Sequence, residues 1–201
     1  MSPRRIKYDK EKVIMAAFKI LREEGWARVT ARSIAELLGA STMPIYSTVE
    51  SMKELEKELQ RRAFQILNEY QLKKYTDNPY LNAAVGYVFF AKEEPHLFRF
   101  LFFERPKKIS TQELINLRRH LPQEVRELPL DYYFTKLSLQ ELDVIQLNSW
   151  IYTHGLAVLI YSGVLTEVSD KDIIHMLESA GRAFYEQKIW KKDKDEDKKN
   201  E

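Results

Sequence analysis

The sequence predicts an all-α protein with an N-terminal three-helix unit and a larger C-terminal helical domain. Apolar residues recur at the spacing of amphipathic helices, and no segment shows the strict alternation of a half-buried strand. Helix-capping signals, in which Ser is followed three residues later by Glu or Asp, precede several of these segments. Only 6 glycines and 7 prolines occur in 201 residues, which fits a helical protein better than a turn-rich β fold.

The first predicted helix spans residues 9–24. Its apolar residues have the i, i+3, i+4, i+7 spacing of one buried helix face: Ile14, Ala17, Phe18 and Leu21. Gly25 follows directly and predicts the end of the helix.

Two short helices follow, separated by a glycine turn. Thr30 can cap the first, Ala31–Leu38, by accepting a hydrogen bond from one of its free amide groups. Gly39 supplies the left-handed residue after it, and Ser41 caps the second, Thr42–Val49. These elements have the dimensions of a helix-turn-helix, although an αα-hairpin without a ligand has the same pattern.

Later helix starts are marked by capping pairs or prolines. Ser51 with Glu54 opens a long helix that presents one apolar face: Leu55, Leu59, Ala63, Ile66 and Tyr70. Two further starts are marked by proline: Asn78–Pro79 begins a helix to about Glu93, and Pro95 precedes the aromatic run His96–Phe103. Three more are marked by capping pairs: Ser110–Glu113, Ser138–Glu141 before residues 139–162, and Ser169–Asp172 before residues 170–190.

Composition and motifs exclude several classes of protein. The absence of cysteine excludes a disulfide scaffold and cysteine-ligated metals. The four histidines are scattered and no glycine-rich phosphate loop occurs, so we expect no catalytic residue, no metal and no cofactor. The N-terminus lacks a signal peptide, and polar side chains interrupt the uncharged run Val144–Thr166, which argues against a membrane span. We expect a cytoplasmic protein.

Charge is distributed unevenly along the chain. Residues 1–74 carry 15 Lys+Arg and 10 Asp+Glu, whereas residues 75–190 carry 12 and 15. The net charge of +2 therefore combines a basic N-terminal part with an acidic body. Such an asymmetry is typical of a polyanion-binding module joined to a second domain, although an ordinary solvated helix surface has the same composition.

The helix-turn-helix segment resembles a known family. Ile34–Val49, which reads IAELLGASTMPIYSTV, is similar to the TetR-family DNA-binding pattern I-A-x-x-x-G-V-S-x-x-x-[LI]-Y-x-x-F. The preceding GWARVT, Gly25–Thr30, is similar to the family's G-[YW]-x-x-[TV]-[ST]. Further on, WIYTHGL, Trp150–Leu156, is similar to the W-x-x-x-H-G-L segment of one group of these regulators. Two motifs in the expected order are more specific than either alone.

The chain departs from the family pattern at two positions. Val49 stands where Phe is usual, and Met52 stands where a helix-starting Lys is usual, with Lys53 beside it. Whether Lys53 takes over the phosphate contact of that Lys is left open by the sequence. Arg4, Arg5 and Lys7 form a basic arm before the first helix, with the role of either a DNA contact or a frayed terminus.

The resemblance implies that the second short helix enters the DNA major groove. It contains no Arg, Lys, Asn or Gln, so bidentate contacts with purines are not available from it. Base readout would come from the hydroxyl groups of Thr42, Ser47 and Thr48, and from Met43 and Pro44 against thymine methyls. Tyr46 is expected at a phosphate, and the other expected DNA contacts are Thr30, Arg32, Ser41 and Lys53.

The resemblance further implies a domain that dimerises and often encloses an effector. We expect a homodimer through helices near 139–162 and 170–190, because two reading heads must meet the two halves of a palindromic operator on double-stranded DNA. The candidate residues for an apolar or aromatic ligand are Phe90, Phe98, Phe102, Tyr133, Trp150 and His154. Aromatic residues at helical spacing also occur in ordinary cores, and a core histidine bonded to a carbonyl would fit His154 equally.

The predicted organisation has three parts: a DNA-binding domain with its basic arm at 1–54, an effector-binding and dimerisation domain at 55–190, and a disordered charged tail at 191–201. The expected function is a transcriptional regulator, most often a repressor in this family, that a small ligand releases from its operator. The alternative is a helical dimeric small-molecule-binding protein or enzyme that does not bind DNA.

Overall fold

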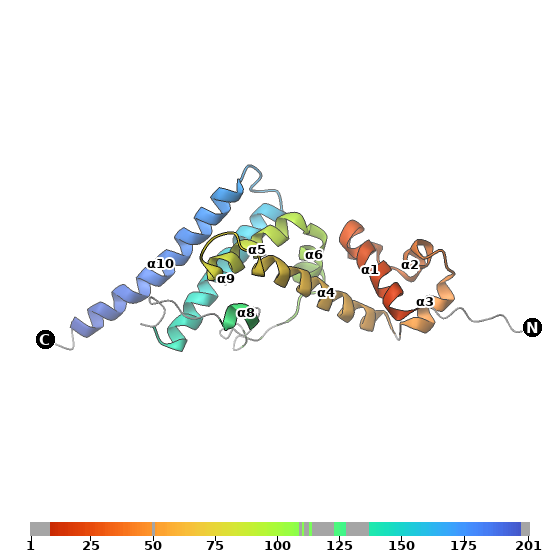
Figure 1. Cartoon of the computed structure of the whole chain (residues 1–201), viewed down its shortest axis with the longest axis horizontal. Coiled ribbons are helices and arrows are strands. Elements are labelled where there is room, and N and C mark those ends of the chain that lie inside the picture. The colour runs from red at the N-terminus through yellow and green to blue at the C-terminus, as the bar shows by residue number, and fades with distance from the viewer. Residues whose placement is uncertain are drawn as a thin grey trace, which may run out of the picture. The chain divides into compact units, whose positions relative to one another are not determined.

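The computed structural model describes residues 9–49, 51–108, 110, 113, 123–127 and 137–197. Within these ranges every regular element is a helix, as predicted (Figure 1). Contacts divide the chain into two compact units. The first contains the residues up to Ile66 together with Glu94–Lys107, and the second contains Leu67–Glu93 and the residues from Lys108 on.

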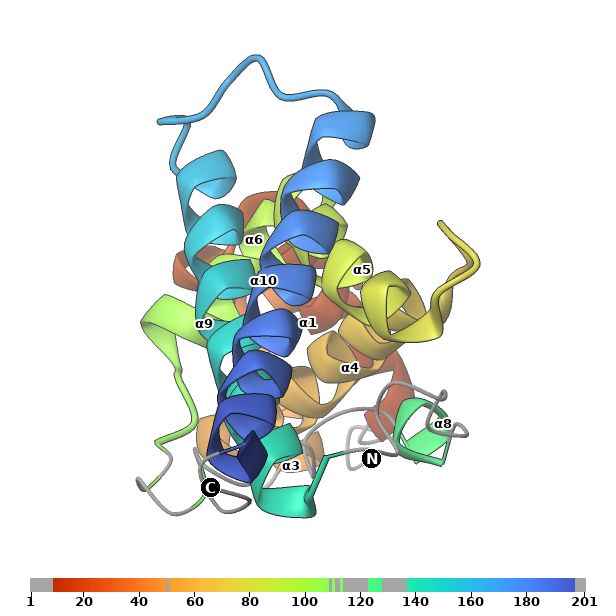
Figure 2. The same ribbon diagram turned by 90° about the vertical axis from the view of Figure 1, so that its left-hand side faces the viewer.

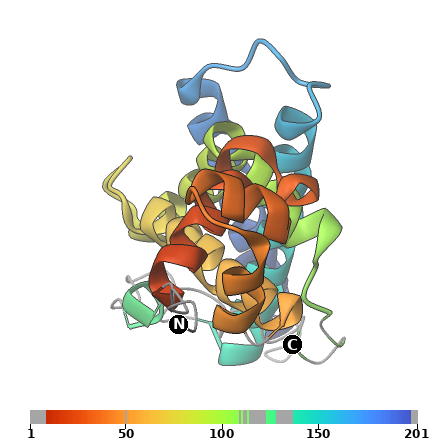
Figure 3. The same cartoon turned by 90° about the vertical axis from the view of Figure 1, so that its right-hand side faces the viewer.

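Three N-terminal helices pack against one another in the first unit (Figure 3, red to orange): α1 (Lys10–Glu24), α2 (Ala31–Leu37) and α3 (Thr42–Thr48). Asp9 caps α1 by accepting a hydrogen bond from the Glu11 amide at 3.1 Å. Gly25 ends α1 with a φ of +88°, a conformation that favours glycine. Apolar side chains from these helices and from the start of α4 (Met52–Leu72) form the buried core of the unit: Val13, Ala17, Leu21, Ile34, Ile45, Leu55 and Leu59.

The aromatic run forms two consecutive helical pieces that also belong to the first unit. These are α6 (Pro95–Arg99) and the π-helical turn η2 (Phe100–Glu104). The ring of Phe100 lies 5.0 Å from that of Trp26 in η1 (Trp26–Arg28), the short 3₁₀ turn after α1. The first unit therefore includes a segment that follows the helix-turn-helix by more than forty residues in the sequence.

Three longer helices build the second unit: α5 (Pro79–Glu93), α9 (Leu139–Tyr161) and α10 (Asp170–Asp197). Each of them contacts the other two, and Figure 2 shows α9 and α10 side by side with α5 against them. The short helix α8 (Gln123–Arg126) contacts α5. The core between the long helices consists of apolar side chains from all three: Val85, Val88, Phe90, Leu156, Ala157, Ile173 and Leu177.

Capping pairs fix the starts of α9 and α10, as the sequence predicts. The Ser138 hydroxyl lies 2.7 Å from the Glu141 carboxylate, and Ser169 lies 2.6 Å from Asp172. Hydrogen bonds from the Ser169 side chain and amide lower the pKa of Asp172 below its usual value. At α4 only half of the predicted pair forms, because Ser51 accepts from the Glu54 amide at 3.2 Å while the Glu54 carboxylate turns to Lys57.

The helix α5 crosses the end of α4 at very close range within the second unit. Gly86 on α5 has no side chain, and a Cβ there would collide with the Tyr70 carbonyl oxygen and the Gln71 backbone. Gln71 adds a hydrogen bond from its side-chain amide to the Ala83 carbonyl at 3.3 Å. Glycine at position 86 is thus required by packing and not by backbone conformation.

Two features differ from the sequence-based expectations. The helix α10 continues to Asp197, through much of the segment 191–201 for which we expected disorder. No Gly or Pro ends the helix there, so nothing in the sequence stops the helix at the predicted end. Ser41 occupies the N-cap position of α3, but its side chain makes no capping hydrogen bond within the described residues. In the same ranges, no helix is both long and apolar enough to span a membrane.

Candidate nucleic-acid interface

The turn between α2 and α3 holds these two helices at a fixed angle. Gly39 adopts a φ of +62°, and the Ala40 amide donates to the Ala35 carbonyl at 2.8 Å. Small and branched side chains fill the space where the helices cross, and all four are buried: Ile34, Ala35, Ile45 and Val49. Val49 is 4% exposed, so it closes this core where the resembled family usually has Phe. The helix-turn-helix predicted from the sequence is present.

The outward side of α3 presents an unusual pair of large side chains. Met43 is 79% exposed and Tyr46 is 65% exposed, whereas Ile45 between them is fully buried. Thr42 at the start of α3 is exposed and Thr48 at its end is half-buried. Pro44 and Ser47 belong to α3, and their side chains lie outside the part of the structure that is described. The predicted base-reading residues Thr42 and Met43 therefore lie at the exposed N-terminal end of α3.

The start of α2 is fixed by a reciprocal capping arrangement. The Thr30 hydroxyl accepts from the Ser33 amide at 3.0 Å, and the Ser33 hydroxyl accepts from the Thr30 amide at 3.0 Å. Ser33 also donates to the Arg28 carbonyl at 2.6 Å. Thr30, expected at a phosphate, thus has a structural role at the helix start, while Arg32 in the first turn of α2 is exposed.

The start of α4 carries the basic side chains expected near DNA. Met52 is half-buried, and Lys53 next to it is exposed. Lys57 pairs with Glu54 at 2.7 Å, and this hydrogen bond, helped by the charges of Lys10 and Lys53, lowers the pKa of Glu54. The exposed lysine is thus displaced by one residue relative to the resembled family pattern.

An ion pair that sequence reasoning missed holds α1 to the segment before α6. Both guanidinium nitrogens Nε and Nη2 of Arg22 donate to the two carboxylate oxygens of Glu94, the Nε contact being 2.8 Å long. Glu94 is only 7% exposed. From the sequence, Glu94 reads as an ordinary carboxylate at a helix end, because its partner lies 72 residues earlier and nothing local marks the pair.

Further contacts attach the same segment to η1 and α4. The Arg105 guanidinium lies 5.4 Å from the centre of the Trp26 ring, and its Nε lies 3.1 Å from the Glu56 carboxylate. Gln60 donates to the Arg105 carbonyl at 2.9 Å. These contacts join the N-terminal helices, the first part of α4 and residues 94–107 into one packed body.

The residues predicted to line a ligand site fall into both units. Phe98, which is fully buried, and Phe102 pack at 5.0 Å in the first unit. Phe90, also fully buried, belongs to the second unit with Trp150 and His154. Tyr133 and the basic arm of Arg4, Arg5 and Lys7 lie outside the described residues. In the described part of the chain, no three His, Asp or Glu side chains gather closely enough to hold a metal ion.

His154 has partners that the sequence did not indicate. Its Nδ1 lies 2.8 Å from the Tyr87 hydroxyl, and its ring stacks on that of Trp150 at 5.3 Å. Burial raises the pKa of Tyr87 and lowers the pKa of His154. Both directions favour the neutral forms of the two side chains, so the contact joins an uncharged phenol and an uncharged imidazole. The Tyr87 hydroxyl is thus one polar partner of this histidine.

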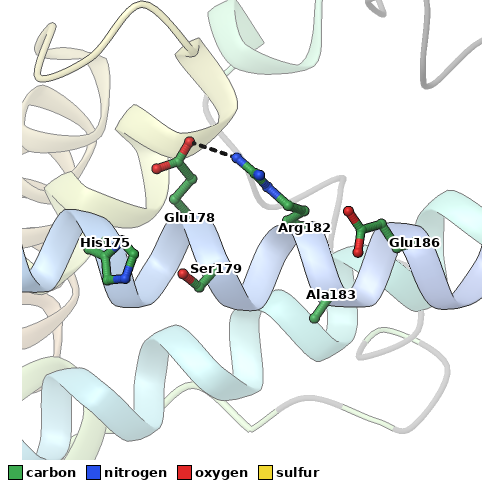
Figure 4. A pocket seen from close by; sticks show the side chains of 6 residues that line it. All are labelled: His175, Glu178, Ser179, Arg182, Ala183 and Glu186. Atoms are coloured by element: carbon green, nitrogen blue, oxygen red, sulfur yellow. Dashed lines mark hydrogen bonds and ion pairs between the residues drawn. The ribbon is translucent and has the colours of Figure 1, made fainter.

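Exposed surface on α9 and α10 forms the other notable feature of the second unit. Five apolar or aromatic side chains of α9 are well exposed: Leu139, Val144, Ile151, Tyr152 and Leu159. A shallow hollow lies along α10, lined by His175, Glu178, Ser179, Arg182, Ala183 and Glu186. Figure 4 shows that these residues all come from α10 and that Glu178 and Arg182 pair across one turn, at 3.5 Å.

Comparison with solved structures gives an informative match. No family model matches this chain, and no curated protein matches its sequence. Its structure is similar to that of a TetR-like transcriptional regulator from Rhodococcus sp. RHA1, with a TM-score of 0.54 and 16% sequence identity. The match covers 90% of this chain and 96% of that chain. The chain thus has the fold of a TetR-like transcriptional regulator, as the two sequence motifs implied.

Proposed function

We propose that this protein is a sequence-specific DNA-binding regulator of transcription. It acts as a homodimeric repressor that a small apolar or aromatic ligand releases from a palindromic operator. The observation that supports this most directly is the outward face of α3, where Met43 and Tyr46 are 79% and 65% exposed. In proteins with a helix-turn-helix, the corresponding face enters the major groove.

The proposed DNA contacts divide into two classes. Thr42 and Met43, with Pro44, Ser47 and Thr48 on the same helix, meet base edges. Five other side chains hold the phosphate backbone and set the register without reading sequence: Thr30, Arg32, Ser41, Tyr46 and Lys53. The exposure of Arg32, Lys53 and Tyr46 supports this second assignment, because a phosphate contact needs a side chain that water can reach.

The proposed dimer forms through α9 and α10. Each chain presents one helix-turn-helix, which reads one half-site, and two half-sites lie about 34 Å apart along the duplex. Ile151 and Leu159, 53% and 44% exposed on α9, support an interface there, since burying them would remove apolar surface from water. We place a helix of the second copy against the hollow along α10.

The proposed effector site lies in the second unit beside Trp150 and His154. A half-buried indole stacked on a neutral imidazole offers a flat apolar surface with one polar group, which suits an aromatic ligand. The Tyr87 hydroxyl, 2.8 Å from Nδ1 of His154, adds a second polar group beside this surface. Release from DNA requires that the ligand favour one conformation over another. Equal operator affinity across an apolar and aromatic ligand library would remove the effector from the proposal.

Selection of bound fragments from random duplex DNA tests the central proposal. The expected result is enrichment of an inverted repeat whose half-sites are separated by about one helical turn. A variant in which Tyr46 is replaced by Ala serves as the control, and we expect it to enrich the repeat poorly or not at all. Failure of the wild-type protein to enrich any sequence would favour the alternative, a helical ligand-binding protein or enzyme that does not bind DNA.

A further inference from the structure

The recognition helix α3 lacks the side chains that make most strong contacts with bases. Its seven residues, Thr42–Thr48, include no Arg, Lys, Asn, Gln, Asp or Glu. Bidentate contacts with guanine or adenine and carboxylate contacts with the cytosine amino group are therefore impossible from this helix. What remains are hydroxyl groups and apolar surface, and the feature that apolar surface can distinguish in the major groove is the C5-methyl group of thymine.

Met43 is the side chain of α3 that can make such a contact. At 79% it is the most exposed large apolar side chain in the described ranges, and it occupies the second position of the helix. In a docked helix-turn-helix, the N-terminal residues of the second helix are the ones that face base edges. Ile45 and Val49 on the opposite side are buried, so Met43 takes no part in the core.

The charge of the unit that carries Met43 favours a duplex over an apolar protein partner. Arg32 on α2 and Lys53 on α4 are both exposed in the same unit. Residues 1–74 carry 15 basic and 10 acidic side chains, so this part of the chain attracts a polyanion. An exposed apolar side chain on a basic unit suits a major groove, where a methyl group lies between two rows of phosphates.

We propose that α3 identifies its operator through thymine methyl groups, with Met43 as the specificity-determining residue. This inference rests on the proposed DNA-binding function and adds the class of sequence that is read. Half-sites should contain thymine at the position that Met43 faces, and removal of that methyl group should weaken binding even though base pairing is unchanged. A long flexible thioether adapts to a methyl group without needing one fixed geometry.

The test replaces thymine by deoxyuridine, one position at a time, in the duplex enriched from random DNA. Deoxyuridine lacks only the C5-methyl group and still pairs with adenine. We expect about a fourfold loss of affinity at the contacted thymine, the amount that corresponds to one buried methyl, and no change elsewhere in the half-site. Met43→Ala should bind the thymine duplex more weakly and lose its sensitivity to deoxyuridine, whereas Met43→Leu should keep it.

The control variant is Val164→Ala, which truncates a side chain that is 73% exposed in the second unit. It should show the full deoxyuridine effect. Since Met43 is exposed, its variants should fold, and thermal unfolding checks that they do. If a duplex is enriched but deoxyuridine leaves the binding affinity unchanged at every position, this inference is overturned while the proposed function stands. Unchanged deoxyuridine sensitivity in Met43→Ala would overturn the role of Met43. If no duplex is enriched, the proposed function itself fails.

Discussion

Tyr46 and Thr42 lie on one exposed helix but are expected to act differently on DNA. Tyr46 is 65% exposed and is proposed at a phosphate, while Thr42 is proposed at a base edge. Tyr46→Phe should weaken binding about tenfold on every sequence, because a hydrogen bond to a charged group is lost. Thr42→Ala should instead reduce the difference in binding affinity between the preferred base and the other three bases at one position of the half-site. Fluorescence anisotropy on the selected duplex and its single-base variants measures both.

The two effects can be separated by their pattern. A phosphate contact does not depend on base sequence, so Tyr46→Phe should reduce the affinity for every duplex by the same factor. Unchanged affinity in both variants would remove α3 from the DNA-binding surface. The exposure of both residues means that neither substitution should change the unfolding temperature appreciably, and that measurement serves as the control.

Glu58 on α4 provides a pH-dependent contribution to stability. Hydrogen bonds from Arg61 and then from Arg62 lower its pKa to about 2, from an ordinary value of 4.5. Between these values the unfolded chain binds a proton that the folded chain does not. The contribution is therefore complete above about pH 4.5 and is lost as the pH falls toward 2.

The expected size of this contribution is about 1 kcal/mol, because solvent screens a side chain that is 27% exposed. Glu58→Gln should lower the free energy of unfolding by that amount at pH 7. The difference in this free energy between the wild type and the variant should decrease as the pH falls from 5 to 3. Urea unfolding at these pH values measures it. Glu69→Gln removes an exposed carboxylate from the same helix and should show little gap at any pH. If the free energies of unfolding of the wild type and Glu58→Gln differ by the same amount from pH 5 to 3, the ionised Glu58 does not make this contribution.

Gly86 is the residue on which the contact between α4 and α5 depends. Gly86→Ala would force the Tyr70 carbonyl and the α5 backbone apart, at a cost of about 1–3 kcal/mol in the free energy of unfolding. The higher helix propensity of Ala opposes this only in part. Gly181→Ala on α10, where the new Cβ would meet no atom within 4 Å apart from its chain neighbours and the backbone of its own helix, should be neutral or slightly stabilising. Equal unfolding midpoints in urea for both variants would show that the close approach is absent.

At the scale of elements, α9 is the helix whose surface most needs a partner. Ile151, in the middle of α9, is 53% exposed. Ile151→Glu should convert a dimer to a monomer at micromolar concentration, because a carboxylate would be buried without a partner in the interface. Leu72→Glu places the same charge on a side chain 46% exposed at the end of α4 and should leave the dimer intact. Sedimentation velocity distinguishes the outcomes, and a dimeric Ile151→Glu would exclude this part of α9 from the interface.

Helix starts were readable from the sequence because their causes are local. Asp9, Ser138 and Ser169 accept hydrogen bonds from amides two or three residues away, and each begins the helix that the sequence predicts. Gly25 and Gly39 end helices through their own backbone angles. The far end of α10 was not predicted, because a run of Lys and acidic residues is equally compatible with helix and with disorder.

The contacts that assemble these elements were not readable in the same way. The Arg22–Glu94 pair joins residues 72 apart, and neither position has a pattern that names the other. The π-helical turn at Phe100–Glu104 likewise lies in an aromatic run that predicts a helix but not its type. The helix-turn-helix was predicted because its turn, cap and core residues lie within one short segment, and because that segment resembles a known motif.

At the scale of the whole molecule, the uneven charge gains a structural explanation. The basic N-terminal residues belong to the unit that contains the helix-turn-helix, and the acidic body supplies most of the second unit. The predicted domain boundary lies at residues 54–55, whereas contacts extend the first unit to Ile66, within α4, and add Glu94–Lys107 to it. A linear boundary cannot express a segment that returns to an earlier part of the chain.

The measurement that tests the central claim most directly is an equilibrium titration of two labelled duplexes with the wild-type protein. One duplex carries the enriched inverted repeat, and the other has the same base composition in scrambled order. At 150 mM salt we predict binding to the repeat that is about a thousandfold tighter or more, since specific and non-specific DNA affinities typically differ by at least that factor. Equal affinity for the two duplexes would contradict the claim that α3 reads a DNA sequence.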